Sequence, residues 1–485
     1  MALLDAAIWG GRINVGGWVE STGGVSDIVE PATGQVLGTA GIANREDVLS
    51  AAALAADSQA GWAAAKPEER AAVLRRAGQL WEEHGAEIQN WIVREAGSIP
   101  PKAALETHLA ANECYEAAAL PSHPHGEVLP SDENRWSFAR RRPAGVVGVI
   151  APFNFPLVLA IRSVAPALAL GNAVLLKPDP RTAVSGGVAL MRIFEEAGLP
   201  AGVLSLLPGD APVGAAVVEA PEVATISFTG STEAGRKVGA LGARLLKRVH
   251  LELGGNSALI VLPGADLTKA ASAGAFGSFM HQGQICMTTG RHFVHESLYD
   301  DYVAELSAKA DNLPVGDPTA AEVALGPVID ERQRDKIDGI VQEAVVQGGR
   351  LTAGGTYEDL FYRPTVLADL ALDNPAFVEE IFGPVAPVTR FSSVDEVVGM
   401  VNANEYGLSV GIIGDLGMAM KIADRVRSGK VHINEQTVSD EANAPFGGVG
   451  VSGTGSRFGG AAANIEAFTE VQWLTMRPDV PQYPF

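Results

Sequence analysis

The sequence predicts an α/β protein built around a parallel sheet. Short apolar runs at 145–150, 173–178, 203–209 and 225–230 each end at or beside Pro or Gly, with helix-like stretches such as 186–198 between them. Strands alternating with helices at this spacing indicate βαβ units whose sheet is covered on both faces. A second apolar series from about residue 253 to about residue 450 predicts a further α/β unit.

Other elements follow in chain order. Residues 46–65 and 67–97 repeat apolar residues at helix spacing, and each stretch opens with acids, so we expect helices there. The segment 121–142 is polar and holds a candidate strand, WSFARRR, and a second candidate strand covers 470–478. Both could be edge strands outside the main body, which would suggest oligomerisation.

Length and composition limit the classes of function. The chain has 485 residues, of which 47% are hydrophobic and 19% charged, so two or three folded domains are expected. Thirty-six Lys and Arg against 57 Asp and Glu give a net charge of −21. That balance disfavours nucleic acid and anionic membranes as partners. Two cysteines form neither a disulfide framework nor a Cys-rich zinc site, so no metal is expected.

The N-terminus MALLDAAIWGG has no basic region followed by a long apolar one, so no signal peptide is expected. The sequence also lacks a run of about 20 uninterrupted apolar residues, the length of a membrane-spanning helix. A cytoplasmic location is therefore expected.

Ligands of open parallel sheets bind beyond the carboxyl ends of the strands. In this sequence those ends read APFNFP, KPDP, PGDAPVG and TGSTEAG. In the last, Gly230 and Gly235 precede a helix, whose N-terminus could bind a pyrophosphate. A P-loop would need Lys and then Ser or Thr after the second glycine, whereas Arg236 follows Gly235. An ordinary strand-to-helix turn is the alternative.

A serine nucleophile is disfavoured. The stretch GLSVG at 407–411 matches the pattern of a nucleophile elbow around Ser409, but strand-like VGIIG follows in place of a helix. His432 is the sole histidine after it.

A cysteine nucleophile is a further reading. Cys286 lies in the polar, glycine-containing stretch HQGQICMTTG, and a thiol of pKa about 8.5 needs activation to react at neutral pH. Glu252, at the end of an apolar strand, is a candidate base, and Asn154 in PFNFP is a candidate oxyanion donor. Taken singly, these residues could also be a core cysteine, a surface acid and a turn residue.

Seven motifs together resemble those of the aldehyde dehydrogenase superfamily, and the resemblance covers nearly the whole chain. Within it, the segments around PFNFP and GQICMTTGR look closest to the NAD-dependent benzaldehyde dehydrogenase group. With this resemblance the single-residue alternatives give way. The motifs are PFNFP (152–156), LLKP (175–178), SFTGSTEAG (227–235), LELGGN (251–256), GQICMTTGR (283–291), EEIFGPV (379–385) and PFGG (445–448).

The resemblance implies the oxidation of an aldehyde, expected to be aromatic, to a carboxylic acid. Cys286 would attack the aldehyde carbon, and the Asn154 amide and the Cys286 N–H would hold the oxyanion. Loss of hydride to the nicotinamide would leave a thioester, for whose hydrolysis Glu252 would activate water. Another aldehyde (salicylaldehyde, vanillin, or an aliphatic aldehyde or semialdehyde) is the alternative substrate. A CoA-acylating semialdehyde dehydrogenase is less favoured because it would not need Glu252.

The resemblance also implies the cofactor site. Lys177 would reach the adenosine ribose, Ser231 and the backbone of 230–235 the pyrophosphate, and Glu380 the nicotinamide ribose. Many NAD-specific members have Glu where this chain has Pro180, so we expect NAD to be preferred and NADP tolerated. The remaining residues expected to bind cofactor are Ile150, Pro152, Phe153, Asp179, Gly209, Phe228, Gly230, Gly235, Leu253 and Phe382.

The substrate pocket is expected to be apolar and to suit a flat ring. By motif position Phe155, Leu159 and Arg162 would line it, with Ile285 and Met287 beside Cys286. Arg162 could bind a polar ring substituent or a carboxylate, but pairing with a local acid is favoured. His281 is expected to have a structural hydrogen-bonding role, and Cys114 to be a packing residue.

The family's architecture implies a Rossmann-type cofactor domain, an α/β catalytic domain and a small β oligomerisation arm. The expected boundaries are 1–120 and 143–252 for the NAD(P)-binding domain, 253–467 for the catalytic domain, and 121–142 and 468–485 for the arm. A homodimer or homotetramer is expected, with a small-molecule aldehyde as substrate.

Overall fold

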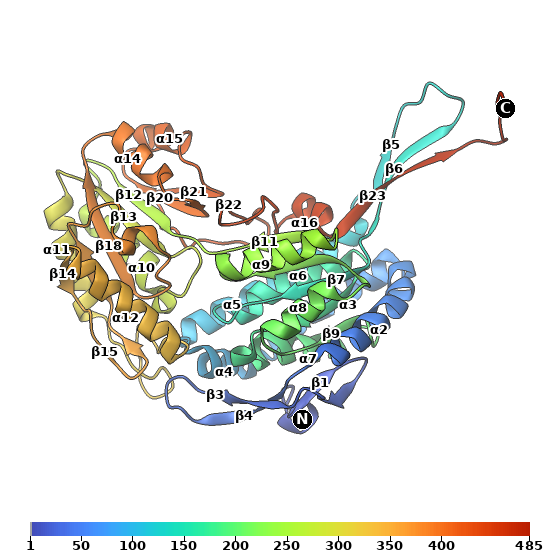
Figure 1. The fold of residues 1–485 in the computed structure, drawn as a ribbon, viewed down its shortest axis with the longest axis horizontal. Helices are drawn as coiled ribbons and strands as arrows, with labels where there is room; N and C mark the ends of the chain where they lie inside the picture. The colour runs from blue at the N-terminus through green and yellow to red at the C-terminus, as the bar shows by residue number, and fades with distance from the viewer. Residues whose placement is uncertain (1) are drawn as a thin grey trace.

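A seven-stranded sheet forms the centre of the first half of the chain. The computed structural model describes residues 2–485, and Figure 1 shows two such sheets side by side. Five strands of the first are parallel and two at its edge are antiparallel, which confirms the predicted α/β class. In spatial order the strands are β11 (Arg248–Glu252), β10 (Val223–Thr229), β7 (Val146–Ile150), β8 (Ala173–Lys177), β9 (Leu204–Leu206), β1 (Arg12–Asn14) and β2 (Trp18–Glu20).

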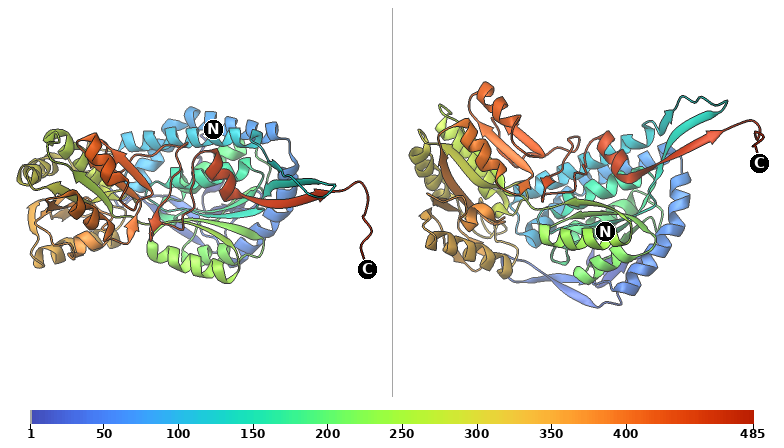
Figure 2. Two further views of the ribbon diagram at one scale, coloured as in Figure 1. Left: turned by 90° about the horizontal axis from the view of Figure 1, so that it is seen from above. Right: turned by 45° about the horizontal axis from the view of Figure 1, so that its top comes forward.

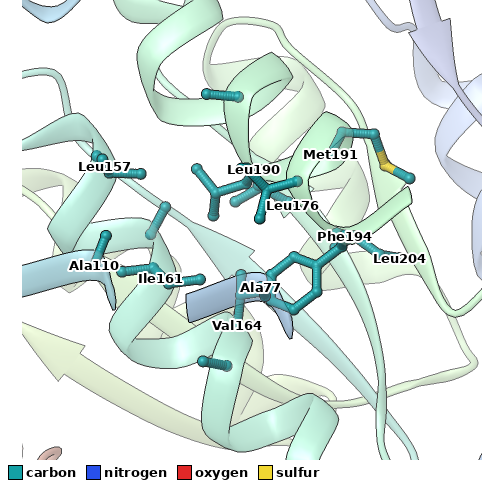
Figure 3. Packing of buried hydrophobic residues seen from close by; sticks show 14 of the residues in the cluster. Ala77, Ala110, Leu157, Ile161, Val164, Leu176, Leu190, Met191, Phe194 and Leu204 are labelled. Atoms are coloured by element: carbon teal, nitrogen blue, oxygen red, sulfur yellow. The ribbon is translucent and has the colours of Figure 1, made fainter. Parts of the chain in front are cut away.

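Helices cover both faces of this sheet, and for that reason its central strands β7 and β8 are almost entirely apolar. Every residue of β7 and β8 is buried. On one face lie α2 (Arg45–Ala64), α8 (Ala211–Glu219) and α9 (Thr232–Arg244); on the other lie α3 (Pro67–Glu83), α4 (Gly85–Ala96), α5 (Pro100–Ala119), α6 (Pro156–Ala169) and α7 (Ala189–Glu196). Figure 3 shows part of the second face, where side chains of α3, α5, α6 and α7 pack on Leu176 and Leu204.

The single helix predicted over 67–97 is two helices. Helix α3 ends before His84, whose backbone (φ −104°, ψ 12°) leaves the helical region, and α4 begins at Gly85. Glycine is a poor helix residue, which is consistent with a break at this point. The apolar periodicity runs on across the break, although the helical backbone does not.

A second seven-stranded sheet forms the centre of the other half. Its strands are parallel apart from β14 at the edge, and helices cover it on both sides. The strands are β14 (Arg350–Ala353), β17 (Thr365–Ala368), β18 (Val385–Phe391), β13 (Thr289–His295), β12 (Ser257–Val261), β20 (Ser409–Ile413) and β21 (Lys430–Ile433). Its helices are α10 (Leu267–Phe279), α11 (Tyr299–Asn312), α12 (Glu331–Val346), α13 (Pro375–Val378), α14 (Val394–Asn402) and α15 (Leu416–Ala423).

A three-stranded ribbon projects from the body (Figures 1 and 2). The two strands predicted near 136–142 and 470–478 are β6 (Trp136–Pro143) and β23 (Thr469–Met476), and they pair with each other along their whole length. Strand β5 (Gly126–Val128) pairs with the other edge of β6. Trp136 and Trp473 are about two-thirds exposed on this ribbon.

Short elements complete the chain. No helix within residues 2–485 is both long and apolar enough to cross a membrane. The remaining elements are α1 (Ala6–Trp9), β3 (Val25–Val29), β4 (Val36–Gly41), β15 (Tyr357–Glu358), β16 (Phe361–Tyr362), β19 (Tyr406–Gly407), β22 (Val449–Gly450), α16 (Ala461–Phe468), the short helical turns Leu120–Ser122, Pro180–Thr182 and Met280–Gly283, and the π-turn Val184–Val188.

Candidate active site

The carboxyl ends of the first sheet open onto a cavity of about 1180 Å³ that is also lined by residues of the second half of the chain. This is the edge at which ligands of open parallel sheets bind. Of the residues expected to bind a cofactor, the cavity is lined by Ile150, Phe153, Lys177, Asp179, Phe228, Ser231 and Glu380. The expected residues that do not line it are Pro152, Gly209, Gly230, Gly235, Leu253 and Phe382.

Three of the six residues that do not line the cavity are glycines, and close packing explains why each position lacks a side chain. A Cβ on Gly235 would lie 2.2 Å from a methyl of Leu253, and one on Gly230 would lie 2.7 Å from the ring of Phe228. One on Gly209 would lie 2.4 Å from a methyl of Val213. Gly235 therefore allows α9 to approach the end of β11, whereas Gly230 and Gly209 leave room for the side chains of Phe228 and Val213.

The polar groups of this cavity fit a dinucleotide. Helix α9 begins at the cavity with Ser231 as its N-cap, and a helix N-terminus favours a pyrophosphate. Glu380 accepts a hydrogen bond from the N–H of Gly255 (2.8 Å), and burial raises the pKa of its carboxyl to about 7. A Cβ on Gly254 would lie 2.3 Å from that carboxylate, so the glycines of LELGGN make room for it.

Three charged residues, Asp179, Arg181 and Asp330, lie together next to Pro180. The Arg181 guanidinium donates to Asp179 (2.8 and 2.9 Å) and to Asp330 (2.5 Å), and it lies 4.3 Å from the centre of the Phe153 ring. Burial opposes ionisation of Asp179, but the hydrogen bonds from Arg181 still hold its pKa below the usual value. Asp330 was not expected at this site, because it lies within the second α/β series, 149 residues along the chain from Arg181.

A smaller, more enclosed cavity holds Cys286. The structure brings together at it Asn154 and the five residues expected to line a substrate pocket: Phe155, Leu159, Arg162, Ile285 and Met287. Sequence reasoning missed Leu105, Leu109, Val158, Met280, Val438, Asp440 and Phe446. Apolar residues on helix α5 look like ordinary core residues, and only Phe446, within PFGG, belonged to a recognisable motif.

The chain reaches Cys286 through a strained turn. His281 and Gln282 have left-handed backbones (φ 48° and 55°), and Gly283 continues in that region (φ 65°). Such strain persists only where the surroundings fix it. The Gln282 amide donates to the carbonyls of Gly97 (2.8 Å) and Pro327 (2.6 Å), and Gln284 accepts from the N–H of Ile329.

The environment of the Cys286 thiol favours its neutral form. The residue is half-buried because it faces the cavity, but the cavity is deep, and burial raises the pKa of the thiol to about 12. Lys430 and, more weakly, Arg162 act in the opposite direction, because a nearby cation stabilises a thiolate.

Asn154 is held from both its side chain and its backbone. Its Nδ2 donates to the carbonyl of Gln284 (2.8 Å), which occupies one of two amide hydrogens. Its carbonyl accepts from the Nζ of Lys102 (2.8 Å), and Lys102 is paired with Glu106. Glu106 in turn accepts from the N–H of Leu157 (3.0 Å) at the start of α6. The pair therefore fixes the segment that carries Asn154.

Replacement of Lys102 by methionine is expected to lower the free energy of unfolding by about 3–5 kcal/mol, since it leaves the Glu106 carboxylate buried without its partner. Urea denaturation measures this. Lys237→Met is the matched control, because Lys237 and Glu233 form the same i,i+4 pair on an exposed surface and should contribute little. Equal losses in the two variants would contradict the assignment of Lys102 as a structural anchor.

Glu252 ends strand β11 as a buried carboxyl group. Neither of its oxygens makes a hydrogen bond of ordinary geometry within residues 2–485, although the backbone N–H of Gly448 acts to lower its pKa. Burial raises its pKa well above the usual value, although Arg457 and Arg162 act in the opposite direction. A buried carboxyl group without such a hydrogen bond is costly for stability and marks a candidate for proton transfer.

Three smaller expectations concern single residues. The structural hydrogen-bonding role expected of His281 stays a prediction: neither ring nitrogen makes a hydrogen bond of ordinary geometry within residues 2–485, the Asn154 backbone is its one hydrogen-bonding neighbour, and the ring packs edge-on against Phe155. Arg162 does pair with acids, as favoured. Ser409 lies inside strand β20 and donates to the Thr437 carbonyl, so it is not at a nucleophile elbow.

Comparison with known proteins agrees with these motifs. A family model described as "Aldehyde dehydrogenase family" matches residues 18–474. A vanillin dehydrogenase of Amycolatopsis sp. is 64% identical over 100% of both chains, and a benzaldehyde dehydrogenase [NAD(+)] of Pseudomonas putida is 48% identical over 99% of both. The crystal structure of a salicylaldehyde dehydrogenase from Pseudomonas putida G7, complexed with salicylaldehyde, superposes with a TM-score of 0.94 at 34% identity, covering 98% of this chain and 99% of that one.

Proposed function

Because this chain belongs to the aldehyde dehydrogenase family, whose members oxidise aldehydes with NAD(P)+, we propose that its own substrate is an aromatic aldehyde and that Cys286 is the nucleophile. The observation that carries this proposal is the enclosed cavity in which Cys286 lies beside Asn154. Its walls are mainly apolar, with Phe155 and Phe446 among them, and such walls suit a planar ring. The vanillin, benzaldehyde and salicylaldehyde dehydrogenases that resemble this chain support the same substrate class.

The proposed chemistry assigns a role to each buried group. The Cys286 thiol releases its proton to water as its sulfur bonds to the aldehyde carbon, and the free amide hydrogen of Asn154 and the Cys286 N–H stabilise the oxyanion that forms. A bound nicotinamide cofactor supplies the acceptor for the hydride that leaves this carbon. The thioester left on Cys286 is then hydrolysed, and Glu252 accepts the proton of the attacking water. The carboxylic acid is released, and Cys286 is free again.

Initial rates of NADH formation with benzaldehyde, ring-substituted benzaldehydes and straight-chain aldehydes test the substrate class. We expect kcat/KM to be at least about tenfold higher for the aromatic aldehydes, because a planar apolar ring fills the cavity and loses less conformational entropy than a flexible chain. Higher kcat/KM for the straight-chain aldehydes would contradict the proposal.

We propose that NAD is preferred and NADP tolerated. Arg181, the cation next to Lys177 and Asp179, already donates to two carboxylates, which leaves it poorly able to bind a 2′-phosphate. The carboxylate of Asp179 would repel that phosphate. We expect kcat/KM for NAD to exceed that for NADP by about tenfold, and Asp179→Asn to narrow the gap. Complete absence of NADP turnover, or a preference for NADP, would contradict this.

We further propose the domain division of the family for this chain: residues 1–120 and 143–252 for the NAD(P)-binding domain, 253–467 for the catalytic domain, and 121–142 with 468–485 as an oligomerisation arm. Helix α16, at the end of the second range, packs in the core of the first half. The projecting ribbon of β5, β6 and β23 supports the arm, because its exposed tryptophans are unusual on a surface that remains in water. A homodimer or homotetramer follows from this proposal.

A further inference from the structure

The cavity at Cys286 has one strongly polar wall. Arg162 lies two turns along α6 from Phe155, and its side chain is only 5% exposed. Helical side chains lean toward the N-terminus of their helix, and Asn154 lies just before the N-terminus of α6. Arg162 and Cys286 line the same cavity.

The hydrogen bonds of Arg162 are incomplete. Its Nη2 donates to Asp440 (2.6 Å) and lies 3.6 Å from Glu113. Its Nε and Nη1 are buried, and neither has a hydrogen-bond partner among residues 2–485. A buried guanidinium N–H without an acceptor costs free energy. A group that enters the cavity and accepts these hydrogen bonds would remove the cost.

The neighbours of Arg162 define what that group can be. The Phe446 ring lines the same cavity, and the cations of Arg162 and Lys430 each lie 4.5 Å from its centre. Lys430 donates to the carbonyl of Ser439, whereas the Asp440 carboxylate, 14% exposed, lines the cavity as an acceptor. The wall thus presents free N–H donors beside a carboxylate acceptor.

We propose that this wall binds a hydroxyl group on the ring of the aromatic aldehyde. A phenolic hydroxyl both accepts and donates, so it can accept from Arg162 and donate to Asp440. A methyl group of similar size satisfies neither residue. A ring carboxylate could accept from Arg162, but it would meet the charge of Asp440. This inference rests on the proposed aromatic substrate class.

The unmodified enzyme provides the first test. Values of kcat/KM are compared for benzaldehyde, its 2-, 3- and 4-hydroxy derivatives, the corresponding methyl derivatives and 4-formylbenzoate. We expect one hydroxy isomer to exceed its methyl counterpart by about 10- to 100-fold, as expected of a hydrogen bond to a charged group. Turnover of benzaldehyde with no hydroxyl advantage at any ring position, or a preference for the carboxylate, would overturn the inference and leave the proposed function intact. Failure to oxidise any of the aromatic aldehydes would instead contradict the proposed function.

Variants of the wall provide the second test. The measurement is the ratio of kcat/KM for the hydroxybenzaldehyde to kcat/KM for the matching methylbenzaldehyde. This ratio does not depend on the amount of folded enzyme. Arg162→Met should bring this ratio close to one, and Arg162→Lys should restore part of it by keeping the charge. Asp440→Asn should also lower the ratio. Asparagine has the same size as aspartate, and this side chain is less buried than that of Arg162, so the substitution leaves no cavity. Arg192→Met is the matched control, since Arg192 pairs with Glu195 and Glu196 far from the cavity, on helix α7. A ratio that is unchanged in both Arg162→Met and Asp440→Asn would overturn the inference.

Discussion

Replacement of Cys286 by alanine is expected to abolish the formation of NADH from an aldehyde, with kcat lowered by about 10⁴-fold or more. A free aldehyde cannot readily lose hydride from its carbonyl carbon. The covalent adduct with sulfur provides an oxyanion, from which hydride is expelled. Removal of a nucleophile from a machinery of cooperating residues typically has an effect of this size. The measurement is the initial rate of NADH formation at saturating aldehyde and NAD.

The second cysteine provides the control. Cys114 lies fully buried in the core of the first half, on helix α5, and the structure gives it a packing environment. Cys114→Ala should therefore keep kcat within a few-fold of the unmodified enzyme, although with some loss of stability. Activity that persists in Cys286→Ala, or that disappears equally in both variants, would contradict the assignment of Cys286.

Replacement of Glu252 by glutamine is expected to separate the two halves of the reaction. The thioester should still form, so mixing enzyme, NAD and aldehyde should give a rapid burst of about one NADH per active site. Steady-state turnover should then be slower by about 10²- to 10⁴-fold, because water is no longer deprotonated as it attacks. Rapid mixing with detection of NADH absorbance measures both phases. Steady-state turnover at the original rate would contradict the role of Glu252.

The pH dependence of the unmodified enzyme provides an independent check on Glu252. Burial raises the pKa of this carboxyl group, and only the ionised form can accept a proton. The kcat should therefore fall as the pH decreases through that raised pKa, well above the range in which an exposed glutamate titrates. In Glu252→Gln the low residual kcat should lack this limb of the profile. Identical profiles for the two enzymes would show that another group is responsible.

The motifs of the sequence were sufficient for the fold class and for the choice of candidate residues. Apolar runs that end in Pro or Gly marked β7, β8, β9 and β10, because strands covered on both faces have no polar side. Their carboxyl ends carried the segments that line the larger cavity. The break at His84 was missed because apolar periodicity records which face is buried and contains no information on whether the backbone continues.

Residues that act through distant contacts could not be found in this way. Lys102 and Glu106 have the spacing of an ordinary exposed helix pair, and nothing local indicates that they are buried against Asn154. Asp330 and Asp440 are ordinary acids in the sequence, yet they meet Arg181 and Arg162 across 149 and 278 residues of chain. Charge pairs of this kind leave no periodic signal, since each partner is placed by a different element.

The sequence by itself determined the α/β architecture and the family, and it supplied Cys286, Glu252 and Asn154 as candidate catalytic residues, because such motifs are short and local. Only the tertiary structure decided the surroundings that tune these residues. It buries Glu252 without a hydrogen bond of ordinary geometry, and it leaves two nitrogens of Arg162 unsatisfied at the wall of the aldehyde cavity. Burial and pairing are properties of the whole packed chain, so the motifs were sufficient to propose the chemistry, whereas the proposal on its selectivity required the fold.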